Sequence, residues 1–194
     1  MPELLIELFS EEIPARMQAQ AAEDFRALIL KGLKDSGIES ADTQAHSTPR
    51  RIVFVAMDLP AARPDTCEER RGPKIGAPED ELNGFLKSCG LNSAQQCEQR
   101  DGYYHAVIEK KGGRTADILP TIVESAIRAL VWPKSMRWGA GEQAWVRPLH
   151  SILCIFDGKV VPVEFAGIKA GNTTRGHRFL APKPIEIKNA GEYE

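Results

Sequence analysis

The sequence predicts an α+β fold in which mixed, largely antiparallel sheets pack against helices. Two long stretches place apolar residues at helical spacing, several shorter apolar runs are typical of strands, and an Asp-Gly pair between two such runs predicts an antiparallel hairpin. At 194 residues the chain is long enough to bury a substantial apolar core.

The first sixty residues predict a strand, a helix and a hairpin. Residues 3–9 form an apolar run that is typical of a buried strand. Residues 14–36 carry apolar side chains at helical spacing and start with Pro14, which the first turn of a helix tolerates. Residues 43–47 and the β-branched run 51–59 predict the two strands of a hairpin.

Residues 60–78 are rich in Pro, Arg and Glu and contain two Gly-linked turn signals, so they are the best internal boundary. The sequence therefore predicts a strand-helix-hairpin part over 1–62 and an α/β part with antiparallel strands at its end over 63–194. A single intertwined domain is the alternative.

For residues 63–194 the sequence predicts mainly helices first and mostly short strands afterwards. Its elements are a short helix over 79–89 capped by Gly90, a strand over 103–110, a long helix over 118–131 ended by Trp132-Pro133, a hairpin over 151–156 and 159–165 joined by Asp157-Gly158, and a last strand over 173–180.

Composition excludes several classes of protein. The apolar runs are far shorter than the roughly 20 residues that span a bilayer, and a formal net charge of −2 with 42% hydrophobic residues argues against disorder of the whole chain. The N-terminus is acidic and does not resemble a signal peptide, so we expect a cytoplasmic protein. The four Cys form no CxxC pair, which predicts reduced thiols without a metal.

Catalytic motifs are missing from the sequence. It contains no P-loop, no GxGxxG after a strand, no HExxH and no GxSxG. Its adjacent carboxylates, such as Glu11 and Glu12, point in different directions in a strand or helix. They therefore do not suit general acid–base catalysis by a pair of carboxylates. We therefore expect no catalytic residue and no metal ligand in this chain.

Charge is unevenly distributed. Residues 1–48 hold four Lys or Arg against nine Asp or Glu, whereas residues 134–178 hold seven against three, with Trp and His interleaved. Arg with aromatic side chains is typical of a surface that binds phosphates and bases. The same composition also suits an ordinary solvated sheet with Trp in its core, and both interpretations stay open at this point.

Six segments, spread over nearly the whole chain in a fixed order, resemble the signatures of a known family. They are Leu4-Leu5-Ile6-Glu7-Leu8-Phe9-Ser10-Glu11-Glu12-Ile13-Pro14-Ala15, Thr48-Pro49-Arg50-Arg51, Gly84-Phe85-Leu86-Lys87-Ser88-Cys89-Gly90, Pro133-Lys134-Ser135-Met136-Arg137-Trp138-Gly139, Arg147-Pro148-Leu149-His150 and Gly171-Asn172-Thr173-Thr174-Arg175-Gly176-His177-Arg178-Phe179. Together they resemble the beta subunit of bacterial heterotetrameric glycyl-tRNA synthetase. Residues 94–104 resemble the family least, and no family property is carried over to them.

The resemblance implies an α2β2 enzyme that joins glycine to its tRNA. The alpha subunit would carry the catalytic site and use ATP and Mg²⁺, so this chain would need no cofactor. The beta subunit would supply tRNA recognition and assembly, and its own C-terminal domains would be further partners. The resemblance also implies a B3/B4-like module, in which helices pack on one side of mixed sheets.

The resemblance and the basic segment together suggest RNA contacts but no catalytic residue. The candidates are Lys134, Arg137, Arg147, Arg175, His177 and Arg178, with Arg50 and Arg51 as weaker ones. The alternative is that these side chains pair with acids of residues 1–48 and hold the fold together. Two competing functions are a protein-interaction scaffold without RNA contact and a standalone hydrolase or editing enzyme.

Overall fold

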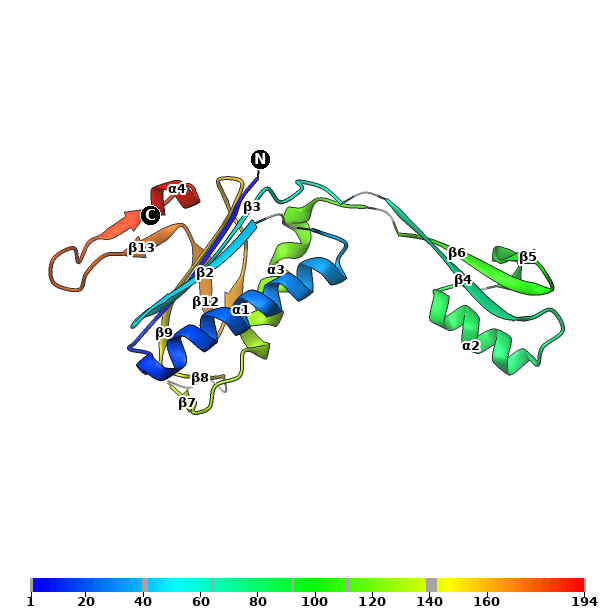
Figure 1. Ribbon diagram of the computed structural model, residues 1–194, viewed down its shortest axis with the longest axis horizontal. Helices are drawn as coiled ribbons and strands as arrows, with labels where there is room; N and C mark the ends of the chain where they lie inside the picture. The colour runs from blue at the N-terminus through cyan, green and yellow to red at the C-terminus, as the bar shows by residue number, and fades with distance from the viewer. Residues whose placement is uncertain are drawn as a thin grey trace. The chain divides into compact units, whose positions relative to one another are not determined.

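The computed structural model describes residues 2–39, 42–63, 65–91, 93–110, 112–138 and 143–193 (Figure 1). Gly139, which ends one of the family-like segments, lies outside these residues. The chain forms two compact units. Unit 1 consists of residues 1–63 and 114–194, and unit 2 consists of residues 64–113. The sequence boundary expected after residue 62 lies beside the first junction, and the chain returns to unit 1 at Arg114.

Unit 1 is built on a mixed sheet with β1 (Leu4–Ser10) in its interior. This strand pairs antiparallel with β3 (Arg51–Met57) on one side and with β9 (Leu149–Phe156) on the other. The sheet is completed by β2 (Asp42–Thr48), β10 (Lys159–Val160), β11 (Glu164–Phe165) and β12 (Ile168–Gly171), of which β12 runs parallel to β9. All seven residues of β1 are buried, as the apolar run predicted.

Two helices pack against one face of this sheet, the arrangement that the resemblance implied (Figure 1). They are α1 (Ala15–Asp35) and α3 (Thr115–Ala129). Phe25 of α1 is fully buried, and its ring lies 6.5 Å from the Phe54 ring of the sheet in an edge-to-face arrangement. A Cβ at Gly32 would lie 2.6 Å from Ile122 Cγ2, so glycine allows the two helices to approach closely here.

The C-terminal segment covers part of the opposite face. It comprises β13 (Thr173–Arg175), β14 (Pro184–Glu186) and α4 (Ala190–Tyr193). Ile187 and Ala190 pack there on Leu5, Val53 and Ile155 in a second, smaller apolar cluster. The sheet is therefore buried on both faces near β1, which explains why residues 4–9 of this strand are apolar apart from Glu7.

Unit 2 is a small antiparallel sheet with one helix. Its elements are β4 (Thr66–Lys74), α2 (Glu79–Cys89), a 3-10 turn at Ala94–Gln96, β5 (Glu98–Arg100) and β6 (Tyr103–Lys110), with strand order β4-β6-β5. A Cβ at Gly72 would meet the Phe85 ring at 2.5 Å, so α2 packs closely on β4. Gly90 ends α2 in the left-handed conformation at φ 70°, as predicted.

The α+β fold class is confirmed, but three predicted details are wrong. Strand β4 lies within 60–78, where the sequence suggested only a boundary segment. The strand expected over 159–165 is interrupted, because Pro162 has no N–H to donate to a ladder. The strand expected over 173–180 ends at Arg175, where a turn follows.

The described cysteines are free thiols, and the tryptophans all belong to one unit. Cys89, Cys97 and Cys154 are unpaired, as predicted, and burial raises the pKa of Cys154 above its usual range. All three Trp of the sequence (Trp132, Trp138 and Trp145) belong to unit 1, so tryptophan fluorescence reports the unfolding of that unit. Among the described helices, none is long and apolar enough to cross a membrane.

Candidate functional site

The structure brings five of the eight predicted RNA-contact residues together. Arg50, Arg51, Arg175, His177 and Arg178 line adjoining grooves on the face of the sheet opposite the helices. We call the four arginines of this group the arginine cluster.

The other three predicted residues lie elsewhere in unit 1. Lys134 and Arg137 are exposed on the segment between α3 and β8 (Ala144–Trp145), where β7 (Met136–Arg137) pairs with β8. Arg147 lies just before β9, and its Nη1 donates a hydrogen bond of 2.9 Å to the Val146 carbonyl. The eight candidate residues therefore lie in two regions of unit 1, of which only one forms a cluster.

The turn between β2 and β3 holds Arg50 and Arg51 beside the end of β1. The backbone N–H of Ser10 donates to the Arg50 carbonyl at 2.8 Å, and the N–H of Ile13 donates to the Pro49 carbonyl at 2.6 Å. The guanidinium carbons of Arg50 and Arg51 lie 4.7 and 5.0 Å from the centre of the Phe9 ring. Two guanidinium groups are thus stacked on one aromatic side chain.

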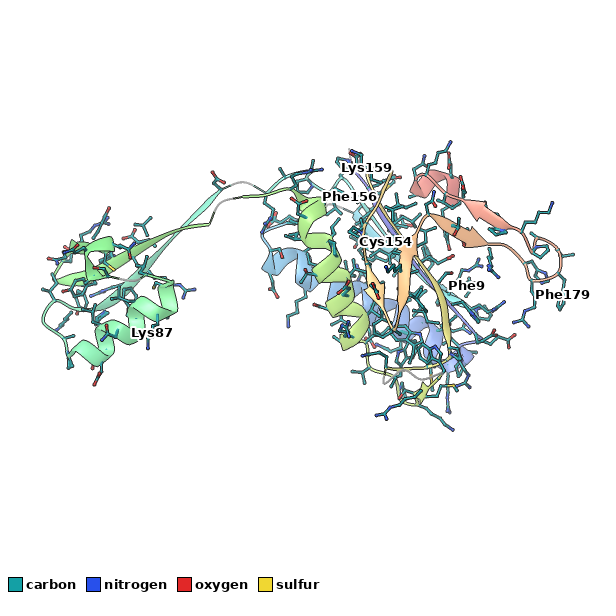
Figure 2. The ribbon with its side chains drawn as sticks, turned by 180° about the vertical axis from the view of Figure 1, so that it is seen from behind. Phe9, Lys87, Cys154, Phe156, Lys159 and Phe179 are labelled. Atoms are coloured by element: carbon teal, nitrogen blue, oxygen red, sulfur yellow. The ribbon has the colours of Figure 1, made fainter. Side chains whose placement is uncertain are left out.

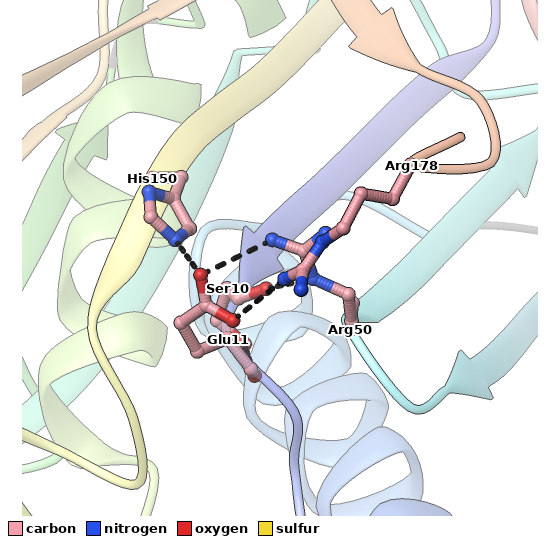
Figure 3. A network of polar contacts seen from close by, with 5 residues as sticks. All are labelled: Ser10, Glu11, Arg50, His150 and Arg178. Carbon is pink, nitrogen blue, oxygen red and sulfur yellow. Dashed lines mark hydrogen bonds and ion pairs between the residues drawn. The ribbon is translucent and has the colours of Figure 1, made fainter. Parts of the chain in front are cut away.

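Glu11 joins three segments of the chain through its carboxylate (Figure 3). His150 Nε2 donates to Oε1 at 2.8 Å, Arg50 Nη2 lies 3.4 Å from the same oxygen, and Arg178 Nη2 donates to Oε2 at 3.1 Å. The hydrogen bond from His150, together with the charges of Arg50 and Arg178, lowers the pKa of Glu11 from its usual value near 4.5.

Replacing Glu11 by Gln is expected to destabilise unit 1 slightly at neutral pH and to have no effect in acid. The lowered pKa means that the carboxylate stabilises the fold above its unfolded pKa, and that this contribution disappears as the pH falls through the folded pKa. Because the Glu11 side chain is 38% exposed, we expect less than about 1 kcal/mol. Chemical denaturation followed by tryptophan fluorescence from neutral pH to about pH 3 measures the difference.

Glu12→Gln is the matched control, because Glu12 is an exposed neighbour with the same charge. A destabilisation by Glu11→Gln that stays the same at every pH would contradict the assigned role of the carboxylate.

Glu7 is a fully buried carboxylate on the same face of the sheet. Thr174 Oγ1 lies 2.8 Å from both of its oxygens, the Tyr193 hydroxyl donates to Oε2, and Arg51 Nε lies 3.3 Å from Oε2 in an ion pair. Burial and the charge of Glu7 together raise the pKa of Tyr193 above its usual range. This network attaches the C-terminal segment to the central strand.

The segment from Thr173 to Glu186 forms a hairpin that we call the arch. Its turn is held by His177, whose Nδ1 accepts hydrogen bonds of 3.3 Å from the N–H groups of Phe179 and Leu180. A Cβ at Gly176 would lie 2.7 Å from Ala181 Cβ, so the turn requires glycine there. Arg51 donates through Nη2 to the carbonyl of Arg175, which fixes the arch beside the turn between β2 and β3.

Three grooves adjoin at the arch. One of them, which we call the arch groove, has a volume of about 480 Å³. Its lining residues are Phe9, Glu12, Thr48, Pro49, Arg50, Arg51, Gly176, His177, Arg178 and Phe179. The neighbouring grooves have volumes of about 560 and 280 Å³ and share arch residues with it. The arginine cluster is therefore accessible from an open surface.

The structure contains features that suit both interpretations of the basic residues, which are contact with RNA and pairing with acidic side chains of residues 1–48. Arg50 and Arg178 pair with Glu11, and Arg51 pairs with Glu7, which is the pairing with acids of residues 1–48 that the sequence left open. The side chain of Arg178 is nevertheless 50% exposed in its ion pair. A group with that exposure can hold the fold and also present donors to a ligand.

The sequence predicted no individual contact for four residues of this site: Glu7, Phe9, Glu11 and His150. Only the pairing of β1 with β3 and β9 brings them beside the basic residues. A usable signal was Glu7, an acid in the middle of a run otherwise made of buried apolar residues. In the described part of the chain, no group of three or more His, Cys, Asp or Glu side chains could hold a metal ion.

Comparison with known proteins gives a consistent result along the whole chain. A family model described as "Glycyl-tRNA synthetase beta subunit" matches residues 4–194. The glycine–tRNA ligase beta subunit of Rhodospirillum centenum is 47% identical over 222 residues, which cover 100% of this chain and 31% of the relative. Those of Paracoccus denitrificans and Dinoroseobacter shibae are each 50% identical and cover 100% of this chain and 29% and 28% of the relatives. The chain thus spans about a third or less of the length of these curated relatives.

Proposed function

The chain belongs to the glycyl-tRNA synthetase beta subunit family, and from this premise we propose that its arginine cluster contacts tRNA. The chain would be the N-terminal part of a glycine–tRNA ligase beta subunit, a cytoplasmic protein. The observation that carries the proposal is the convergence of Arg50, Arg51, Arg175 and Arg178 on adjoining grooves. Guanidinium groups bind phosphate through paired N–H donors and stack on bases, so this composition suits RNA.

The lining of two of these grooves is electrostatically suited to phosphate. The arch groove and its smaller neighbour are lined by the four arginines against two carboxylates, Glu11 and Glu12. A third carboxylate, Glu7, is buried beneath Arg51 and does not face solvent. The surface therefore keeps a positive excess, even though two of its arginines pair with Glu11.

We assign the chemical step of glycylation to a partner. The name of the relatives, beta subunit, implies a partner subunit, and we propose that an alpha subunit binds ATP and Mg²⁺ and joins glycine to the tRNA.

The double variant Arg175→Ala/Arg178→Ala tests the proposal. Glycine tRNA should bind this chain about 10-fold or more weakly after the double substitution, and the slope of log affinity against log salt should become shallower by about one for each phosphate group that the variant no longer binds. Fluorescence anisotropy at several salt concentrations measures both quantities, with an unrelated tRNA as the comparison for specificity.

Lys31→Ala/Lys34→Ala is the matched control, because it removes two exposed positive charges from α1 on the other side of the sheet. The melting temperature of each variant is measured in parallel, since loss of Arg178 also removes one of the three partners of Glu11. If wild type and double variant bind tRNA with the same affinity and salt slope, the cluster serves only to hold the fold and the proposal is wrong.

Assembly is the second candidate function, and the exposure of Phe179 and Leu180 favours it. In that case the chain would dock the alpha subunit or other domains of the beta subunit without touching RNA. Because apolar docking releases few counterions, its affinity would change little with salt. Salt-independent binding to an alpha subunit, with no binding of tRNA at low salt, would support assembly over RNA contact.

A further inference from the structure

Phe179 is a large aromatic side chain in an unusual position. It is 80% exposed, although it lies in a turn whose backbone is fixed by His177 (Figure 2). The N–H of Ala181 also donates to the His177 carbonyl at 2.8 Å, which closes the turn. The ring is therefore presented to solvent by an ordered backbone and contributes little to the core.

The arch groove lies directly beside this ring. Phe179 forms part of its lining, together with Arg178 and with the Arg50 and Arg51 groups stacked on Phe9. Its volume of about 480 Å³ falls within the roughly 300–1,000 Å³ that is usual for small-ligand sites. The groove thus combines an exposed aromatic face, planar guanidinium groups and room for a group of nucleotide size.

We propose that the arch groove binds an unpaired nucleotide, with its base stacked on Phe179 and its phosphate bound by Arg178. The proposal rests on the RNA contact of the proposed function and adds the kind of RNA that this surface selects, which is a single-stranded segment. Base stacking on aromatic side chains, flanked by cations that follow the backbone, is how proteins hold single strands without reading their sequence.

A duplex would leave Phe179 unused. In a base-paired helix the faces of the bases are covered by their neighbours, and only phosphates, 2′-hydroxyls and base edges are exposed. The arginines alone could follow a duplex backbone, but the ring needs an unstacked base. The position of Phe179 beside the arginine cluster therefore favours single-stranded RNA.

A protein partner explains the surroundings of Phe179 less well. A stable protein interface buries about 800 Å² on each partner, with an apolar core. Phe179 and Leu180 are the two large apolar residues exposed at the turn, and an aromatic side chain supplies only about 150–250 Å². Half of the residues that line the groove are arginine, histidine or glutamate, and three arginines face a single carboxylate there, a balance of charge that suits phosphate.

The test compares an unstructured RNA oligonucleotide with a duplex of the same sequence, using this chain and four variants. Phe179→Ala and Phe179→Leu should weaken binding of the single strand by about 5- to 150-fold, because each removes the aromatic ring. Phe179→Trp keeps an aromatic ring and should bind the single strand about as tightly as wild type. Leu180→Ala is the matched control, since Leu180 is 85% exposed in the same turn, and it should bind like wild type. Binding of the duplex should be unchanged in all four variants.

The outcomes separate this inference from the proposed function. Wild-type affinity of Phe179→Ala for the single strand would overturn the stacking role, and so would wild-type affinity of Phe179→Leu, which would indicate an apolar docking surface. If tRNA binding still depends on Arg175 and Arg178 in that case, the proposed RNA contact stands without the nucleotide site. If neither RNA binds wild type at low salt, the proposed function itself is wrong.

Discussion

Replacing Glu7 by Ala is expected to lower the free energy of unfolding of unit 1 by about 3–5 kcal/mol, the usual cost of removing one partner of a buried ion pair. The substitution leaves the Arg51 guanidinium without its carboxylate and removes the acceptor of Thr174 and Tyr193. Unpaired polar groups in a buried site lose their hydration without compensation. Urea unfolding followed by tryptophan fluorescence measures this difference in unit 1.

Three further variants identify which contact matters. Glu7→Gln keeps an acceptor and removes the charge, so it should cost less than Glu7→Ala. Thr174→Val and Tyr193→Phe each remove one donor and leave the ion pair with Arg51, so each should cost about 1 kcal/mol. In Glu7→Ala, the backbone amide hydrogens of the arch should also exchange with solvent faster than those of β1. Stability of Glu7→Ala within about 0.5 kcal/mol of wild type would show that the network does not hold the arch.

Replacing Phe25 by Ala is the second change with a large expected effect. Phe25 is fully buried between α1 and the sheet, and its ring meets Phe54 edge to face. Removing a buried aromatic ring typically costs about 3–5 kcal/mol, because transfer free energy is forfeited and a cavity remains. The same fluorescence-detected unfolding should therefore show a midpoint at much lower urea concentration, with the slope of the transition unchanged.

Phe25→Leu is the control, because it keeps most of the apolar volume and should cost clearly less. The variant Phe54→Ala completes a double-mutant cycle with Phe25→Ala. The ring pair should appear as a coupling of about 0.5–1.5 kcal/mol. Additive losses of stability would mean that the two rings contribute only through their separate burial.

The elements that the sequence predicted well are those whose pattern is local. The helices predicted over 14–36 and 118–131 repeat apolar residues at helical spacing and are observed as Ala15–Asp35 and Thr115–Ala129. The helix that ends before Gly90 has its own cap. The hairpin over 43–47 and 51–59 was predicted from its β-branched run and is observed as β2 and β3. Each of these signals lies within about twenty consecutive residues, so one sequence is enough to see it.

The arch shows what a local pattern cannot supply. The sequence predicted one strand over residues 173–180, but the strand ends at Arg175. The turn that follows is selected by the tight contact of Gly176 with Ala181 and by hydrogen bonds to His177. What anchors it is the Glu7 carboxylate, 167 residues before Thr174 in the chain. No window of the sequence contains both partners.

The sequence predicted only part of the candidate site, because the residues of this site also come from distant segments of the chain. The family signatures contained Arg50, Arg51, Arg175 and Arg178, and the structure gathers these on adjoining grooves. They also contained Lys134 and Arg137, which lie on a different segment of unit 1. Similar motifs show which residues a family uses, but only the sheet register shows that Glu11, His150 and Arg178 meet.

The interleaved order of the two units sets an order of events during translation. Unit 2 is continuous, from residue 64 to 113, so all its strands have been synthesised before the ribosome reaches α3. The strand β1 is made first, yet it must wait for β9, and Glu7 must wait for Thr174 and Tyr193. The middle of the chain can therefore fold while the nascent N-terminal strand, apolar along most of its length, is paired only with β3. Until β9 emerges, one edge of that strand remains open to chaperones and to other nascent chains.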